Sequence, residues 1–156
     1  MTNEIFARRR QKVVDTLKDQ SALFLFSGDV KQRSLDGDYP FCVNRNFFYL
    51  TGLDEPGYVL QVSKLAGQVT QTLYLPRPDP YQELYFGRMP TAEEMVESTG
   101  LDRAVYLDKM EWELNRLFAR NYFEHLYMDF HKRELNTVAY PENDLAARIM
   151  QAHPYL

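Results

Sequence analysis

Hydrophobic residues recur at helical spacing in some segments of this chain and form strand-like runs in others, and together these patterns predict an α/β protein. Residues 3–19 place apolar side chains at helical spacing, and residues 141–152 are predicted to form a final helix. Residues 91–99 begin with a Thr91/Glu94 capping box and predict a short helix. The remaining elements are predicted as a helix at residues 108–121 and strands at residues 22–27, 46–51, 57–63, 69–75, 104–107 and 125–130.

The order of these elements predicts one domain over residues 1–156. Helices alternate with strands in the second half, which indicates a three-layer α/β/α fold with a mixed central sheet of about six strands. Hairpin turns in the first half predict antiparallel strands at the edges of that sheet. In the strand predicted at residues 46–51, alternation places Phe47 and Tyr49 on one face and Phe48 and Leu50 on the other. If helices cover both faces of the sheet, all four side chains are expected to pack in the core.

Two polar stretches interrupt the hydrophobic pattern. Residues 31–40 are predicted to form a loop, and residues 76–80 contain three prolines, which force an extended surface segment. The residues that follow are poor core material and are candidates for a substrate cleft or an interface: Tyr85, Phe86 and Arg88. Gly87 allows a tight bend, and the planar guanidinium of Arg88 can donate two hydrogen bonds to a carboxylate. An internal salt bridge and a contact with another molecule both remain open for Arg88.

Composition and charge narrow the classes of partner. The net charge of −4 argues against nucleic acid, and the basic cluster at residues 8–12 is interpreted as the solvated face of a helix. The single cysteine, Cys42, permits no intrachain disulfide, fits a reducing compartment and is expected to be a buried, inert thiol. A polar start and the lack of an apolar run of about 20 residues predict a cytoplasmic protein with no membrane segment.

The residues capable of catalysis form no recognisable catalytic or metal motif. The histidines have no partner at metal-ligand spacing, and Cys42 has no histidine near it in sequence. Asp36 with Asp38, and Asp129 with His131, could each seed a cation or acid–base site. A stabilised turn and a hydrogen-bonded surface pair are the simpler interpretations. We therefore assign no catalytic and no metal-binding residue to this chain.

Several short motifs occur in an order that resembles the amino-terminal domain of the aminopeptidase P and prolidase family. The landmarks run from about residue 6 to about residue 107, and the most specific are Tyr39-Pro40-Phe41, Phe47-Phe48-Tyr49-Leu50-Thr51-Gly52, Glu55-Pro56 and Phe86-Gly87-Arg88. The chain departs from the family pattern at Cys42, where an arginine is usual, at Arg45-Asn46 and at Tyr85, where a tryptophan is common.

The resemblance implies a non-catalytic domain of a metal-dependent Xaa-Pro aminopeptidase or Xaa-Pro dipeptidase. In such enzymes a carboxy-terminal pita-bread domain binds two divalent metal ions, usually manganese or cobalt, and cleaves peptides with proline at the second position. The amino-terminal domain is expected to support a homo-oligomer and to close one side of the substrate cleft, which Tyr85 and Arg88 are predicted to reach. The alternative is a free-standing binding or interaction module of the same fold without peptidase activity.

Overall fold

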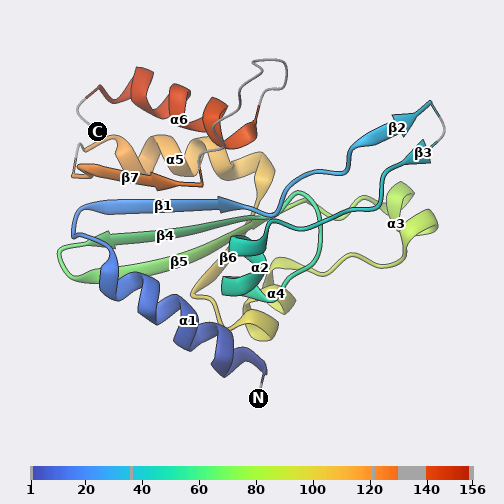
Figure 1. The fold of residues 1–156 in the computed structure, drawn as a ribbon, viewed down its shortest axis with the longest axis horizontal. Helices are drawn as coiled ribbons and strands as arrows, with labels where there is room; N and C mark the ends of the chain where they lie inside the picture. The colour runs from blue at the N-terminus through green and yellow to red at the C-terminus, as the bar shows by residue number, and fades with distance from the viewer. Residues whose placement is uncertain (1, 36, 121, 130–139, 155–156) are drawn as a thin grey trace.

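The protein folds around one mixed sheet with helices on both faces. A computed structural model describes residues 2–35, 37–120, 122–129 and 140–154. Figure 1 shows the elements, which in chain order are α1 (Thr2–Thr16), β1 (Ser21–Phe26), β2 (Gln32–Ser34), β3 (Gly37–Asp38), α2 (Arg45–Thr51), β4 (Val59–Leu65), β5 (Gln68–Leu75), α3 (Pro80–Phe86), α4 (Ala92–Thr99), β6 (Arg103–Tyr106), the short 3₁₀ turn η1 (Leu107–Lys109), α5 (Met110–Phe118), β7 (His125–Met128) and α6 (Pro141–Ala152).

The central sheet has the strand order β6-β5-β4-β1-β7, so the predicted α/β architecture is confirmed with five strands. β4 pairs antiparallel with both β1 and β5, whereas β7 runs parallel to β1 and β6 runs parallel to β5. The prediction of antiparallel edges was wrong, because the antiparallel pairs lie in the centre. The edge strand β6 follows α3 and α4, and such a crossover returns the chain in a parallel direction.

Two hydrophobic cores lie on opposite faces of the sheet. On one face, α1, α2 and α4 pack against residues such as Leu60 and Leu73, both of which are fully buried. On the other face, α5 and α6 pack around Phe24 and Phe118. Burial on both sides explains the continuous apolar run of β1.

The aromatic segment predicted as a strand is the helix α2, and this prediction was wrong. Asn44 begins the helix, because its side-chain oxygen accepts hydrogen bonds from the amides of Asn46 and Phe47. Gly52 ends it in the left-handed conformation at φ 73°. A helix buries Phe47 and Leu50 on one side and leaves Phe48 and Tyr49 exposed, so only half of the four expected core residues lie in the core.

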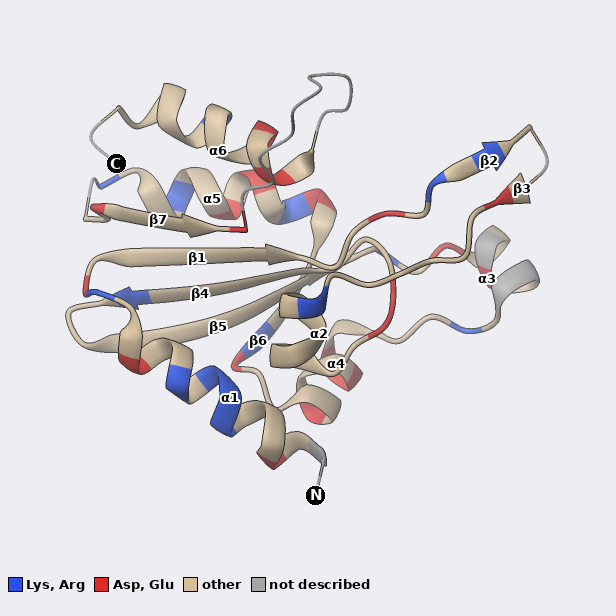
Figure 2. Cartoon of the chain, in the orientation of Figure 1, with Lys and Arg blue, Asp and Glu red and all other residues tan. Residues whose placement is uncertain are grey.

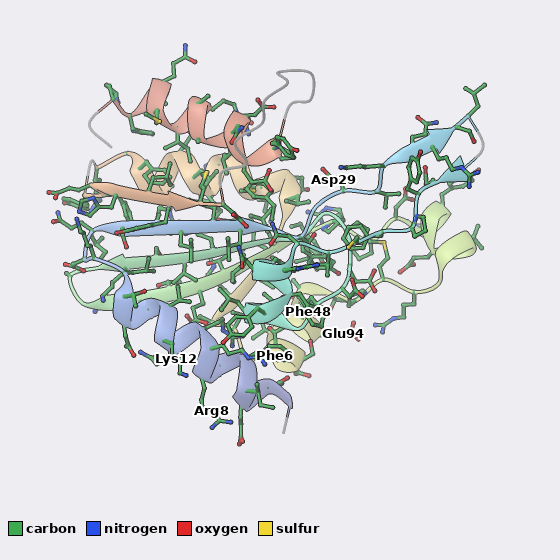
Figure 3. The ribbon with its side chains drawn as sticks, viewed as in Figure 1. Phe6, Arg8, Lys12, Asp29, Phe48 and Glu94 are labelled. Atoms are coloured by element: carbon green, nitrogen blue, oxygen red, sulfur yellow. The ribbon has the colours of Figure 1, made fainter. Side chains whose placement is uncertain are left out.

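The basic cluster of α1 is divided between solvent and core. Figure 3 shows Arg8 and Lys12 on the outer side of α1, as a solvated face predicts. Arg10, in contrast, is only 2% exposed. Its guanidinium donates to Gln71 Oε1 at 2.6 Å, to the Leu50 carbonyl at 3.0 Å and to the Thr99 carbonyl at 3.1 Å. Arg10 therefore ties α1 to β5, α2 and α4, and the interpretation of the whole cluster as solvated was wrong.

Candidate functional site

Two segments extend away from the sheet beyond the end of β1, and we call them together the projecting arm (Figure 1). The first comprises residues 30–35 and 37–40, where β2 and β3 form a small antiparallel sheet of their own. The second comprises residues 78–88 and contains α3. A loop was predicted for residues 31–40, and the two-stranded ladder corrects that prediction.

Local capping builds α3 directly after the proline-rich segment. The Asp79 side chain accepts a hydrogen bond from the Tyr81 amide at 2.9 Å, and Pro80 occupies the first helical position, where its missing N–H costs nothing. Gly87 ends the helix at φ 87°, a conformation that favours glycine. The extended segment predicted for residues 76–80 therefore ends one residue early, and most of the candidate residues that follow lie on a helix.

The projecting arm carries the two most exposed of the large apolar side chains among the described residues. Leu35 is 95% exposed and Leu84 is 81% exposed. Val30, Tyr39 and Tyr81 are exposed as well. Such a concentration of exposed hydrophobic residues on projecting segments is typical of a surface that contacts another protein or another domain.

The candidate Arg88 forms an ion pair within the chain. Its guanidinium donates to Glu94 Oε1 at 2.6 Å, and the two side chains are 69% and 43% exposed. Glu94 also accepts from the Thr91 amide, which completes the predicted capping box of α4. These hydrogen bonds lower the pKa of Glu94, the Thr91 amide being the larger cause, while the bond to Glu94 raises the pKa of Arg88. A contact of Arg88 with another molecule stays a prediction.

The other two candidates, Tyr85 and Phe86, lie in the last turn of α3, three and two positions before Arg88. Their side chains lie outside the described part of the structure. The helical backbone nevertheless places both residues on the projecting arm and not on the sheet.

Of the remaining polar candidates, the structure describes Asp38 and Asp129. Asp129 follows β7 and accepts hydrogen bonds from the side-chain amides of Asn44 at 3.2 Å and Asn46 at 2.8 Å. Asp38 lies exposed on β3, and Asp36 and His131 fall outside the described residues. In the described ranges, no group of three or more His, Cys, Asp and Glu side chains could hold a metal ion.

Sequence reasoning missed the two asparagines and misjudged the cysteine. Asn44 caps α2 and also helps to hold the end of β7, and an asparagine seven residues before Thr51-Gly52 is a helix-start signal that could have revealed the cap. Cys42 is an exposed free thiol, contrary to the expected burial, because it lies in the irregular return from β3 to α2.

Among the described helices, none combines the length and apolar character needed to cross a bilayer. Figure 2 shows that basic residues line α1, whereas acidic residues recur along α4.

Comparison with known proteins finds relatives of one kind. The model of the family "Aminopeptidase P, N-terminal domain" matches residues 6–127. The Xaa-Pro aminopeptidase of Escherichia coli K12 is 31% identical over 118 residues, which cover 75% of this chain and 27% of that protein. Human Xaa-Pro aminopeptidase 3 is 29% identical over 127 residues, covering 73% of this chain and 25% of that protein.

Solved structures show the same relationship in three dimensions. Proline aminopeptidase P II from Yersinia pestis superposes with a TM-score of 0.82 at 29% identity, covering 99% of this chain and 34% of that one. Aminopeptidase P from E. coli with the inhibitor Pro-Leu gives 0.81 at 27% identity, covering 97% and 33%. The chain thus spans about a quarter to a third of its relatives. With most of its length matched by the family model and nearly all of it superposed on such enzymes, the chain belongs to the aminopeptidase P N-terminal domain family.

Proposed function

We propose that this chain acts as the non-catalytic amino-terminal domain of a metal-dependent Xaa-Pro aminopeptidase or Xaa-Pro dipeptidase. The observation that carries the proposal is the superposition of nearly the whole chain on about a third of such enzymes, together with the match to a model of their N-terminal domain. The catalytic domain is expected in a further roughly 200 residues, the size of one ordinary domain. The substrates are peptides with proline at the second position.

The metal pair of such an enzyme does not fit the residues described in this chain. The described residues form no cluster of three or more metal-binding side chains, so the proposal assigns the two divalent ions, manganese first, to the catalytic domain. We derive no step of the reaction through them. The chain by itself is expected to show no turnover of Xaa-Pro peptides with or without added Mn²⁺.

The projecting arm is proposed to support the oligomer and to shape the substrate cleft. Its exposed leucines, Leu35 and Leu84, offer apolar area that association would remove from water. Tyr85 and Arg88 lie at the end of the same arm, where a neighbouring subunit or the catalytic domain is proposed to meet them.

Variants of the enzyme that contains this domain test the role of the arm. A Leu35→Ser, Leu84→Ser double variant is expected to shift the oligomer toward smaller species in sedimentation velocity. The matched control is Met150→Ser, an exposed apolar residue on α6. Tyr85→Ala and Arg88→Ala are expected to lower kcat/KM for Xaa-Pro peptides. Unchanged assembly and unchanged turnover in all three test variants would reject the role of the arm.

The parent gene distinguishes this proposal from the free-standing module. A reading frame that continues into a domain with two aspartates, a histidine and two glutamates as metal ligands supports the peptidase. A stop codon directly after Leu156, together with a partner captured through the arm, would favour the interaction module.

A further inference from the structure

A cavity of about 570 Å³ lies at the root of the projecting arm, where the chain leaves β1. Figure 3 places Asp29 at this point of departure. Phe26, Val59 and Leu107 contribute apolar wall, while Asp29, Cys42 and Glu142 contribute polar groups. An apolar pocket with a few polar groups is the usual form of a small-molecule site.

Backbone hydrogen bonds hold one side of this cavity in place. The Ser27 amide donates to the Tyr58 carbonyl at 2.8 Å, and the Tyr58 amide donates to Ser27 Oγ at 2.9 Å. The Asn44 amide donates to the Ser27 carbonyl at 2.8 Å. Because three chain segments are joined at one serine, this part of the pocket is formed before any ligand arrives.

Glu142 is the feature of the pocket that folding alone leaves unexplained. Its side chain lines the cavity at the start of α6, and the residue is only 5% exposed. Its Oε2 atom is shielded from solvent and has no hydrogen-bond partner among the residues that the structure describes. None of the ion pairs recorded among the described residues includes Glu142. The helix N-terminus favours a negative charge there, but a buried carboxylate oxygen without a donor still carries a desolvation cost.

We propose that this pocket binds a small organic cation, a primary ammonium or guanidinium group carried on a short apolar body. The cation would compensate the Glu142 charge from the cavity side, where a low dielectric strengthens the attraction. Asp29 at the rim adds a second negative charge, and the aromatic and aliphatic walls suit the apolar body. Lys31 also lines the pocket, and its ammonium group would compete with the ligand for the negative charges. Because Lys31 is exposed to solvent, it leaves the pocket open to a ligand. A carboxylate ligand is disfavoured by Glu142.

Titration of the chain with n-butylammonium chloride and with agmatine, followed by amide chemical shifts, tests the proposal. We expect saturable shifts at the amides of Ser27, Gly28 and Gly57, and equal concentrations of sodium chloride or sodium butyrate should not reproduce them. Glu142→Gln keeps the shape of the side chain and should weaken binding about tenfold or more, since it removes a charged partner. Glu97→Gln, on the exposed side of α4, is the matched control and should leave the affinity unchanged.

The single thiol provides a second measurement on the unmodified sequence, should Glu142→Gln fail to fold. Cys42 is exposed and lines the same cavity. A cationic methanethiosulfonate reagent should modify it faster than an anionic one of equal size, and n-butylammonium should slow the modification. The inference fails if the amide shifts follow ionic strength alone, if butyrate binds as well as butylammonium, or if Cys42 reacts equally with both reagents and is not protected.

Discussion

Two leucines, Leu60 and Leu84, show how differently this chain uses the same residue type. Leu60 lies on the central strand β4 and is 0% exposed, whereas Leu84 lies on α3 and is 81% exposed. The first belongs to the body, which we define as the five-stranded sheet with α1, α2, α4, α5 and α6, and the second belongs to the projecting arm. Identical side chains thus stabilise the fold in one region and remain available for a partner in the other.

The comparison separates the residues that hold this domain together from those proposed to contact other molecules. The body buries one apolar core on each face of the sheet, and it also buries an arginine by providing three acceptors. The arm retains exposed apolar residues on short elements that contribute little to either core. Substitutions in the body should therefore change the free energy of unfolding, and substitutions in the arm should change association.

Matched truncation of the two leucines should show the largest difference. Leu60→Ala should destabilise the chain by about 2–5 kcal/mol, because it removes buried contacts and leaves a cavity. Leu84→Ala should change the stability by less than about 0.5 kcal/mol. Urea unfolding followed by circular dichroism measures both. Equal losses in the two variants would show that the arm is part of the folding core.

Arg10 and Arg88 form the second matched pair. Arg10→Ala should cost about 2–4 kcal/mol, since it leaves the Gln71 side chain and two carbonyls without their donor. Arg88→Ala removes an exposed ion pair and should have little effect on unfolding. The same urea titration compares them, with Arg10→Lys as a control that keeps the charge but loses the planar fork. A mild effect of Arg10→Ala would contradict its role as the link between α1 and the sheet.

Tyr74 and Tyr39 extend the comparison to a single hydroxyl group. The buried Tyr74 hydroxyl donates to Gln61 Oε1 at 2.7 Å, so Tyr74→Phe should cost about 1 kcal/mol. Tyr39 is exposed on the arm, and Tyr39→Phe should be neutral. Differential scanning calorimetry can resolve a shift of this size. Should Tyr39→Phe be the more damaging change, the hydroxyl of the arm would have a structural role that the fold does not show.

Glu94 lies where the arm returns to the body, and its effect should be the smallest and dependent on pH. Its lowered pKa means that the carboxylate stabilises the folded chain above its ordinary pKa of 4.5 and loses this contribution as the pH falls below that value. Glu94→Gln should therefore lower Tm slightly at pH 7 and less at pH 3. Glu97→Gln, on the exposed side of the same helix, is the control. A Tm difference that grows toward acid pH would reverse the expected sign.

Most of the body could be predicted from local patterns. The last helix was predicted at residues 141–152 and is α6 over Pro141–Ala152, because a proline start and amphipathic spacing mark it clearly. The Thr91/Glu94 capping box likewise marks α4. The strand predicted at residues 46–51 was wrong because aromatic residues favour strands, whereas the cap at Asn44 and the terminating Gly52 stabilise a helix.

The candidate site was predicted less well. Tyr85, Phe86 and Arg88 were identified in sequence, yet the helical form of α3 and the pairing of Arg88 with Glu94 appear only in the structure. Glu142 carried no sequence signal at all, because an acidic residue in the first turn of a helix is commonplace and usually exposed.

The amino-acid sequence by itself determined the α/β class, the family and the position of most elements, because these depend on periodicity, caps and ordered motifs that act over short distances. Only the tertiary structure decided which edges of the sheet are parallel, which arginine of α1 turns inward, and that Glu142 lines a cavity at the root of the arm. Those outcomes depend on contacts between residues far apart in the chain, and local pattern carries no information about them.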